Sequence, residues 1–407
     1  EAAASANAAQ AKKQAEAAAK ARAAAWSDPG RPELVLEWMT PLGTKLLELE
    51  LWYSDSNLEV FSIPSQSGLL QRPPPGANRD DLIQEWRVLR FTKPKVDSNI
   101  VQSVVKLWVA PPGSPELPRP LHAAVLPFPY NRTVASVVLS SLQVLAAPVL
   151  LRAEKGHAKG KAKGKAEGWS QSQRLNILCI GLGGGSLAAF FHDFLPHCYV
   201  DAVELEPAVL EAAQEALGFE TGPRLNVEVD DGVAFADQAA KRVAGSSRAY
   251  DAVIIDAMDQ DGQVCRGLQC EHGGGRFGTA LARGLLRDSG GLVAVNLMSH
   301  SSPFELCKGY KAALSRKYEQ LGEAFMVRAQ GTNNYVAVQT CGEVAESAFG
   351  QDDRHVIIEH LHKAARQVQA AIRCPFDIAR FAELQSLFVL SKGTPDQALA
   401  REWQPVR

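Results

Sequence analysis

The chain has 407 residues, of which 46% are hydrophobic and 22% are charged. This composition is close to that of an average globular protein and excludes wholesale disorder, and the length indicates two or three domains. With 43 basic and 45 acidic residues, the net charge is -2. The chain as a whole is therefore not a polyelectrolyte partner for nucleic acid, and we expect none to bind.

The seven cysteines are scattered along the chain and odd in number. This pattern argues against a secreted disulfide framework and for a reducing compartment. We therefore expect an intracellular protein, cytoplasmic in the first place. An organelle stays open as an alternative, because the chain begins with Glu1 and its N-terminus looks processed or truncated.

Residues 1–28 are rich in alanine, with interspersed charged residues. Alanine has the highest helix propensity, which predicts a helix. The segment has no stripe of large apolar side chains with which to pack. We expect an exposed helical extension, with a docking helix for a partner as the alternative.

Residues 30–150 predict a small β-rich domain and a following helix, because short β-type segments alternate there with turn-rich stretches. The uncharged stretch 133–151 is nineteen residues long, close to the length that crosses a membrane. Its polar residues favour a buried helix instead, and we expect no membrane span. The expected elements are strands at Leu34–Trp38, Lys45–Tyr53, Glu85–Phe91 and Val101–Trp108, and a helix at Asn131–Ala147.

Residues 151–172 are expected to form a linker or loop, because lysine and glycine dominate residues 154–168. Such a composition cannot build a core. Lysines neutralise phosphates, so a phosphate contact is the alternative. There are no aromatic residues among the lysines on which bases would stack.

From residue 173 to residue 345, apolar runs alternate with helical patterns, which predicts a parallel sheet covered on both faces. Residues 325–328 and 334–339 predict a closing hairpin, and residues 346–407 predict a helical extension. The expected strands are Leu175–Gly181, Tyr199–Leu205, Leu225–Val229, Tyr250–Asp256 and Gly291–Met298, and the expected helices are Leu187–Phe194, Pro207–Leu217 and Gly275–Leu286.

A glycine-rich turn, Gly181–Gly185, follows the first of these strands. Glu204, then Asp231 with Gly232, then Asp256 follow the next three. Each acid alone has a second interpretation as a helix N-cap. Four such features at the carboxyl ends of neighbouring strands stand where an α/β sheet binds ligands. They favour an adenosine-type ligand, with the Glu204 carboxylate placed to accept the ribose hydroxyls.

The glycine spacing G-x-G-x-G, with an acid ending the second strand, resembles S-adenosylmethionine-dependent methyltransferases of the seven-strand class. Dinucleotide-binding proteins space their glycines as G-x-G-x-x-G. The stretches Phe194-Leu195-Pro196, Asp201-Ala202-Val203-Glu204 and Gly218-Phe219 resemble the spermidine-synthase-like branch of that class. Within it, residues 85–340 are most similar to the C-terminal domain of elongation factor 1-alpha lysine and N-terminal methyltransferases, through Leu89-Arg90-Phe91, Ile100-Val101-Gln102-Ser103 and Gly267-Leu268-Gln269-Cys270.

The resemblance implies an α/β fold: a Rossmann-like seven-strand sheet, a small N-terminal β-rich domain and helical extensions. It also implies S-adenosylmethionine as the cofactor and a role for each residue of the constellation. The glycines would line the methionine part, Glu204 would hold the ribose, and the acid–glycine pair would face the adenine. Asp256 would stand beside the transferred group. The implied residues are Gly181, Gly183, Gly185, Glu204, Asp231, Gly232 and Asp256, with Asp259 and Asp261 in a substrate loop.

The expected reaction is methylation of a protein amine, a lysine or an N-terminus, with a translation factor among the candidate acceptors. Polyamine synthases share the scaffold and are the rival. Their glycine motif has an aspartate where this chain has Gly184, and their loop reads roughly Asp-Ser-Ser-Asp-Pro where this chain has Asp256-Ala257-Met258-Asp259-Gln260. Without those acids a buried polyamine cation would be left unpaired, which disfavours polyamine synthesis.

A non-catalytic scaffold is a third interpretation, because the loop after Cys270 is glycine-rich where the related family is proline-rich. Cys265, Cys270 and His272 lack a fourth ligand and have an unusual spacing for a metal site, so we expect no metal. His300 is more typical of a satisfied loop histidine than of a catalytic base.

Overall fold

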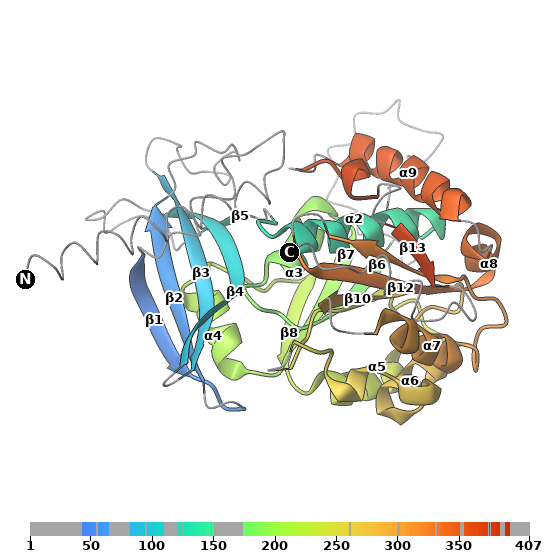
Figure 1. Cartoon of the computed structure of the whole chain (residues 1–407), viewed down its shortest axis with the longest axis horizontal. Coiled ribbons are helices and arrows are strands. Elements are labelled where there is room, and N and C mark those ends of the chain that lie inside the picture. Colours follow the sequence, from blue (N-terminus) through green and yellow to red (C-terminus); the bar gives the residue numbers. More distant parts are fainter. Residues whose placement is uncertain are drawn as a thin grey trace, which may run out of the picture.

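The computed structural model describes residues 43–53, 56–64, 82–93, 96–109, 121–123, 126–147, 149, 174–259, 262–298, 302–329, 332–350, 354–372, 374, 376–382 and 387–390. These residues form a small sheet near the N-terminus and a large sheet covered by helices (Figure 1). The expected segments 1–28 and 151–172, and the expected strand Leu34–Trp38, lie outside the described residues.

The small sheet is antiparallel throughout, with its strands in the order β1-β2-β3-β4-β5. The prediction of a small antiparallel sheet is confirmed. The expected strand Lys45–Tyr53 ends at Glu50 instead. β2 was not among the expected strands, although its alternate residues Leu58 and Val60 are buried. The strands are β1 (Thr44–Glu50), β2 (Asn57–Pro64), β3 (Ile83–Lys93), β4 (Val96–Val109) and β5 (Leu121–Ala123).

The large sheet has the strand order β13-β11-β12-β10-β9-β6-β7-β8. Neighbours from β10 to β8 are parallel, whereas β12 and β13 run antiparallel to the strands they pair with. The expected seven-strand sheet is confirmed from β11 to β8, and β13 adds an eighth strand beside β11. The strands are β6 (Leu175–Ile180), β7 (Cys198–Glu204), β8 (Leu225–Val229), β9 (Ala252–Ile255), β10 (Gly291–Met298), β11 (Ala324–Arg328), β12 (Asn334–Cys341) and β13 (Leu387–Leu390).

Helices cover both faces of the large sheet, as Figure 1 shows for α2 and α9 on one side and α5, α6 and α7 on the other. Side chains alternate between the two cores: Ile177 joins the first, and its neighbour Leu178 joins the second. The helices are α2 (Pro129–Val144), α3 (Ser186–Phe194), α4 (Pro207–Glu215), α5 (Gly232–Val243), α6 (Gly275–Arg283), α7 (Pro303–Leu314), α8 (Glu343–Phe349) and α9 (Arg354–Ala371), with short 3-10 turns at η5 (Arg266–Leu268), η6 (Glu271–Gly273) and η7 (Ala379–Ala382).

The buried helix expected after the small sheet is α2, which begins at Pro129 and packs with its Val134, Val138 and Leu142 in the first core. Its Ser136 and Ser140 are also fully buried. Among the described residues, no helix combines the length and apolarity that a membrane span requires.

The two sheets are joined through α4, the helix that lies between β7 and β8 of the large sheet in the chain. Ala212 and Leu217 of the α4 region share one hydrophobic cluster with Leu58, Leu89 and Leu107 of the small sheet. The small sheet therefore sits over the helix that begins beside the carboxyl end of β7 (Figure 1).

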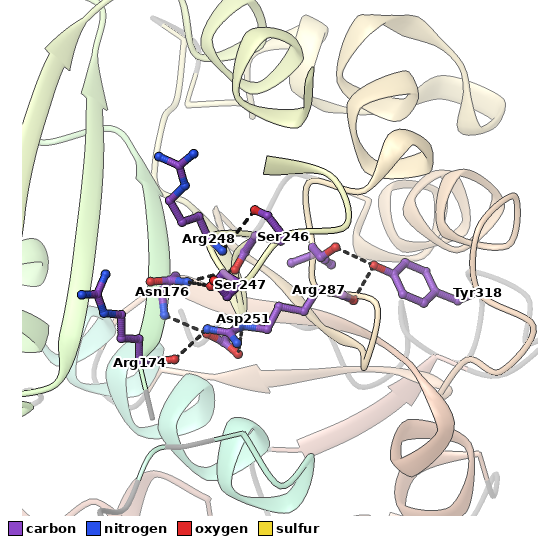
Figure 2. A network of polar contacts seen from close by, with 10 residues as sticks. Arg174, Asn176, Ser246, Ser247, Arg248, Asp251, Arg287 and Tyr318 are labelled. Carbon is purple, nitrogen blue, oxygen red and sulfur yellow. Dashed lines mark hydrogen bonds and ion pairs between the residues drawn. The ribbon is translucent and has the colours of Figure 1, made fainter. Parts of the chain in front are cut away.

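A polar network closes the opposite, amino end of the parallel strands (Figure 2). Asp251, which is 2% exposed, pairs with Arg287 at 2.7 Å and accepts the N–H of Asn176 at 2.7 Å. Arg287 donates in turn to the carbonyl of Arg174 at 2.6 Å. Tyr318 donates to the carbonyl of Arg287 at 2.8 Å. The network joins the beginnings of β6, β9 and β10.

Candidate cofactor site

The glycine turn begins where the end of β6 meets the end of β9. Gly181 has φ +98°, and its N–H donates to the carbonyl of Val203 at 2.8 Å. A Cβ atom at this position would overlap the main chain of Asp256, so only glycine fits here. The turn and Asp256 are therefore in direct contact. Gly183 and Gly185, the other two predicted glycines, also have positive φ.

Gly184 is covered by Ser103, which comes from β4 of the small sheet. Its N–H donates to Ser103 Oγ at 2.9 Å. A Cβ atom on Gly184 would lie 2.6 Å from that oxygen and 3.2 Å from Leu217 Cδ1. The small sheet thus contacts the outer side of the turn and leaves no room there for a side chain.

Glu204 ends β7 and is half-buried beside the turn. Its carboxylate accepts the N–H of Leu182 at 2.9 Å, that of Gly183 at 3.4 Å and that of Glu206 at 3.0 Å. Burial raises the pKa of Glu204, and these backbone donors lower it in part. An ionised carboxylate accepts about four hydrogen bonds, so capacity remains for a ligand hydroxyl.

Asp231 and Gly232 stand at the same edge, since Glu204 pairs in register with Val229 two residues before Asp231. Asp231 is exposed and caps α5, where its Oδ1 accepts the N–H of Ala234 at 2.8 Å. The N-cap interpretation therefore holds for this acid, and its second carboxylate oxygen is available to a ligand.

Asp256 is held by a chain of amides across the sheet. Asn296 Nδ2 donates to Asp256 Oδ1 at 2.7 Å, and Asn334 Nδ2 donates to Asn296 Oδ1 at 3.1 Å. Burial raises the pKa of Asp256, and the bond from Asn296 lowers it in part. The negative charge of Asp256, after burial itself, also raises the pKa of Tyr130 well above its ordinary value. Tyr130, at the start of α2, therefore keeps its phenol proton.

The predicted substrate loop follows β9. Asp259 is exposed and closes a turn there, accepting the N–H of Gln263 on Oδ1 at 2.9 Å and donating its own N–H to the carbonyl of Gln263 at 2.8 Å. Asp261 and His300 lie outside the described residues. Among the residues that the structure places, no group of three His, Cys, Asp or Glu side chains gathers as metal ligands would.

Three residues of the site were not predicted from the sequence as functional. Asn296 carried a signal, because it is the one polar residue in the apolar run Gly291–Met298. Ser103 lies in a stretch that carried the family resemblance, and Tyr130 follows an apolar segment, but neither has a pattern that assigns it to the site. Both come to the site from outside the large sheet.

No known family model matches the chain. Over 206 residues it is 28% identical to the eEF1A lysine and N-terminal methyltransferase of Danio rerio, a match that covers 50% of this chain and 27% of that protein. Over 83 residues it is 30% identical to the polyamine aminopropyltransferase of Vibrio vulnificus, covering 20% of this chain and 26% of that one. The chain thus spans about a quarter of the length of either relative.

Among solved structures, human methyltransferase-like protein 13 in complex with SAH is similar at a TM-score of 0.40 and 24% identity, over 57% of this chain and 90% of that one. The predicted resemblance to spermidine-synthase-like methyltransferases is confirmed by the curated relatives. The longer of the two sequence matches is to the methyltransferase.

Proposed function

We propose that this chain is an S-adenosylmethionine-dependent methyltransferase that methylates a protein amine, with elongation factor 1-alpha as the first acceptor to test. The observation that carries the proposal is the direct contact between the glycine turn and the main chain of Asp256. It supports a position next to the turn for a residue whose carboxylate is suited to bind an amine. The acceptor is taken from the name of the relatives.

The residues present fit the cofactor. The turn Gly181–Gly185 offers close backbone approach, and Glu204 retains acceptor capacity for one ribose hydroxyl. Asp231 keeps one carboxylate oxygen for the adenine side. When bound, S-adenosylmethionine would supply an electrophilic methyl carbon.

The chain's own residues would then prepare the acceptor. An amine attacks only in its neutral form, so it needs a proton acceptor or a carboxylate that stabilises the charge it gains. Asp256, fixed by Asn296, would hold the amine beside the turn. The protonated phenol of Tyr130 would contribute a second polar group there. The enzyme's main contributions would be alignment and exclusion of water.

Polyamine synthesis is the weaker alternative, because Ser103 fills the space that a side chain at position 184 would need. Ala257 and Met258 follow Asp256, where a polyamine would need further carboxylates. Only a measurement of methyl transfer distinguishes a non-catalytic scaffold from an active enzyme. We further propose that residues 30–150 and 173–345 act as one catalytic unit, because Ser103 contacts the cofactor turn.

The test is transfer of a labelled methyl group from S-adenosylmethionine to purified elongation factor 1-alpha. Labelling is expected with the wild-type chain. Asp256→Asn should lower kcat at least about a hundredfold while cofactor binding, measured by calorimetry, stays within about twofold. Glu204→Ala should instead abolish cofactor binding. Cofactor binding without transfer to any protein would favour the scaffold, and preferential binding of the decarboxylated cofactor would favour polyamine synthesis.

A further inference from the structure

Two aromatic side chains extend into solvent from the turn after β1. Trp52 is 75% exposed and Tyr53 is 62% exposed, which makes them the most exposed large hydrophobic residues in the part of the chain that the structure describes. Trp and Tyr are the residues that contribute most to protein–protein binding when a partner buries them. Such a pair at a loop tip indicates an interaction surface.

The backbone that carries this pair is fixed to the large sheet. The N–H groups of Trp52 and Tyr53 donate to the two carboxylate oxygens of Glu206 at 2.9 and 2.8 Å. Glu206 is 8% exposed and occupies the N-cap position of α4, where the helix dipole favours a negative charge. Leu51 is buried in the cluster shared with α4. Because the backbone of Trp52 and Tyr53 is already held, a partner would lose little entropy in binding these two residues.

The fixed turn stands next to the cofactor edge. The N–H of Glu206 donates to Glu204 Oε1 at 3.0 Å, so the residue that anchors the aromatic pair directly contacts the acid assigned to the ribose. Leu205 and Val229, 40% and 42% exposed, are two further exposed apolar residues at the ends of β7 and β8.

The strand that precedes the pair and the segment that contains Glu206 are rich in acidic residues. Residues 44–50 and 205–231 contain nine acidic and two basic residues. Of the two bases, Lys45 is paired with Glu48 at 2.6 Å, and Arg224 donates to three backbone carbonyls. The surface thus offers two aromatic rings within a field that attracts a basic segment.

We propose that Trp52 and Tyr53 form the docking site of the methyl-acceptor protein. A basic segment would cover the two rings while its amine enters the neighbouring cofactor edge. This inference rests on the proposed function, since the amine is what identifies the partner. The surface suits a basic acceptor better than a second copy of this chain. In a dimer formed through this surface, like charges would face each other.

The test measures binding of purified elongation factor 1-alpha to the full chain by interferometry, together with calorimetric titration of S-adenosylmethionine. The variant is Trp52→Ser with Tyr53→Ser, which leaves both backbone N–H donors to Glu206 in place. Its affinity for the acceptor should fall at least about tenfold, and its cofactor affinity should stay within about twofold. Raising the salt concentration from about 0.05 M to about 0.3 M should weaken wild-type binding.

Val344→Ser in α8 is the matched control, because Val344 is also an exposed hydrophobic residue, at 36%; its acceptor affinity should not change. The docking site would be overturned if the double variant bound the acceptor as tightly as the wild-type chain does. It would also be overturned if the wild-type chain did not bind the acceptor. A loss of cofactor affinity in the double variant would also overturn it and assign the rings to the cofactor. Dimers of the wild-type chain that the variant lacks would assign the surface to a second copy. Failure of the wild-type chain to bind the cofactor would contradict the proposed function, and the acceptor titration would still decide on the surface.

Discussion

At the scale of single residues, Gly184 is a position at which this chain differs from polyamine synthases, which have an aspartate there. A Cβ atom on Gly184 would lie 2.6 Å from Ser103 Oγ, so the aspartate of the rival family would displace Ser103 and break its hydrogen bond with the turn. Gly184→Asp should therefore lower the affinity for S-adenosylmethionine at least about tenfold and lower the melting temperature. Calorimetric titration and thermal unfolding measure the two effects.

Gly222→Asp is the control for this substitution. Gly222 is exposed, and a Cβ atom there would meet nothing within 4 Å, so affinity and melting temperature should stay near the wild-type values. If Gly184→Asp kept its affinity, or gained aminopropyl transfer from the decarboxylated cofactor, the steric argument against polyamine synthesis would be wrong.

Glu204 gives the candidate site a pH dependence. Burial raises the pKa of its carboxyl above the ordinary value, and only the ionised form is free to accept hydrogen bonds on both oxygens. As the pH falls through this raised pKa, the carboxylate gains a proton and cofactor affinity should fall, at a higher pH than an ordinary glutamate would give. Calorimetry between about pH 4.5 and about pH 8 measures this fall. Glu204→Gln should bind weakly with little dependence on pH, and a steep dependence in that variant would point to another group.

At the scale of elements, β4 matters because it carries Ser103 to the glycine turn. Ser103→Ala leaves the N–H of Gly184 without its partner, a loss of about 1 kcal/mol, so cofactor affinity should fall several-fold while kcat changes little. Ser62→Ala is the control: Ser62 lies in the same sheet and donates to Glu85 at 2.8 Å, away from the turn. It should lower the melting temperature without changing cofactor affinity. Equal affinity losses in both variants would mean a general effect of the small sheet.

Elements also show how far the sequence can predict this fold and site. Strands β8 and β10 have the predicted bounds because each lies between clear breaks, β8 as an alternating apolar and polar segment and β10 as an apolar run. β13 was not expected, because its four residues are too few to show a period. The acids at the strand ends follow from the α/β pattern. The bond from Gly184 to Ser103 joins residues 81 positions apart, and local patterns carry no information about such contacts.

At the scale of the whole molecule, the two ends of the parallel sheet have different tasks. The carboxyl end carries the turn, Glu204 and Asp256, with polar groups left for ligands. The amino end is tied by Asp251 and Arg287 across three strands (Figure 2). Burial raises the pKa of Asp251 to about 6, although Arg287 and the N–H of Asn176 oppose the shift. The contribution of Asp251 to the free energy of unfolding therefore depends on pH.

The sign of this dependence follows from proton binding. Unfolded aspartate has a pKa of about 3.9, so the folded state holds the proton more tightly, and the free energy of unfolding should fall as the pH rises from about 4 to about 6. The full shift corresponds to about 3 kcal/mol, of which about 2 kcal/mol is lost between about pH 4 and about pH 6. Asp251→Asn removes the titrating group, and its unfolding free energy should lack this fall, although the uncompensated Arg287 lowers it at neutral pH.

Urea unfolding of both chains across this pH range measures the difference. Asp288→Asn is the control, because Asp288 lies in the same region but is 64% exposed and pairs with Lys317 at 2.6 Å. That variant should keep the wild-type pH dependence. If Asp251→Asn also kept it, the titrating group would lie elsewhere, and the amino-end network would act through packing and hydrogen bonding alone.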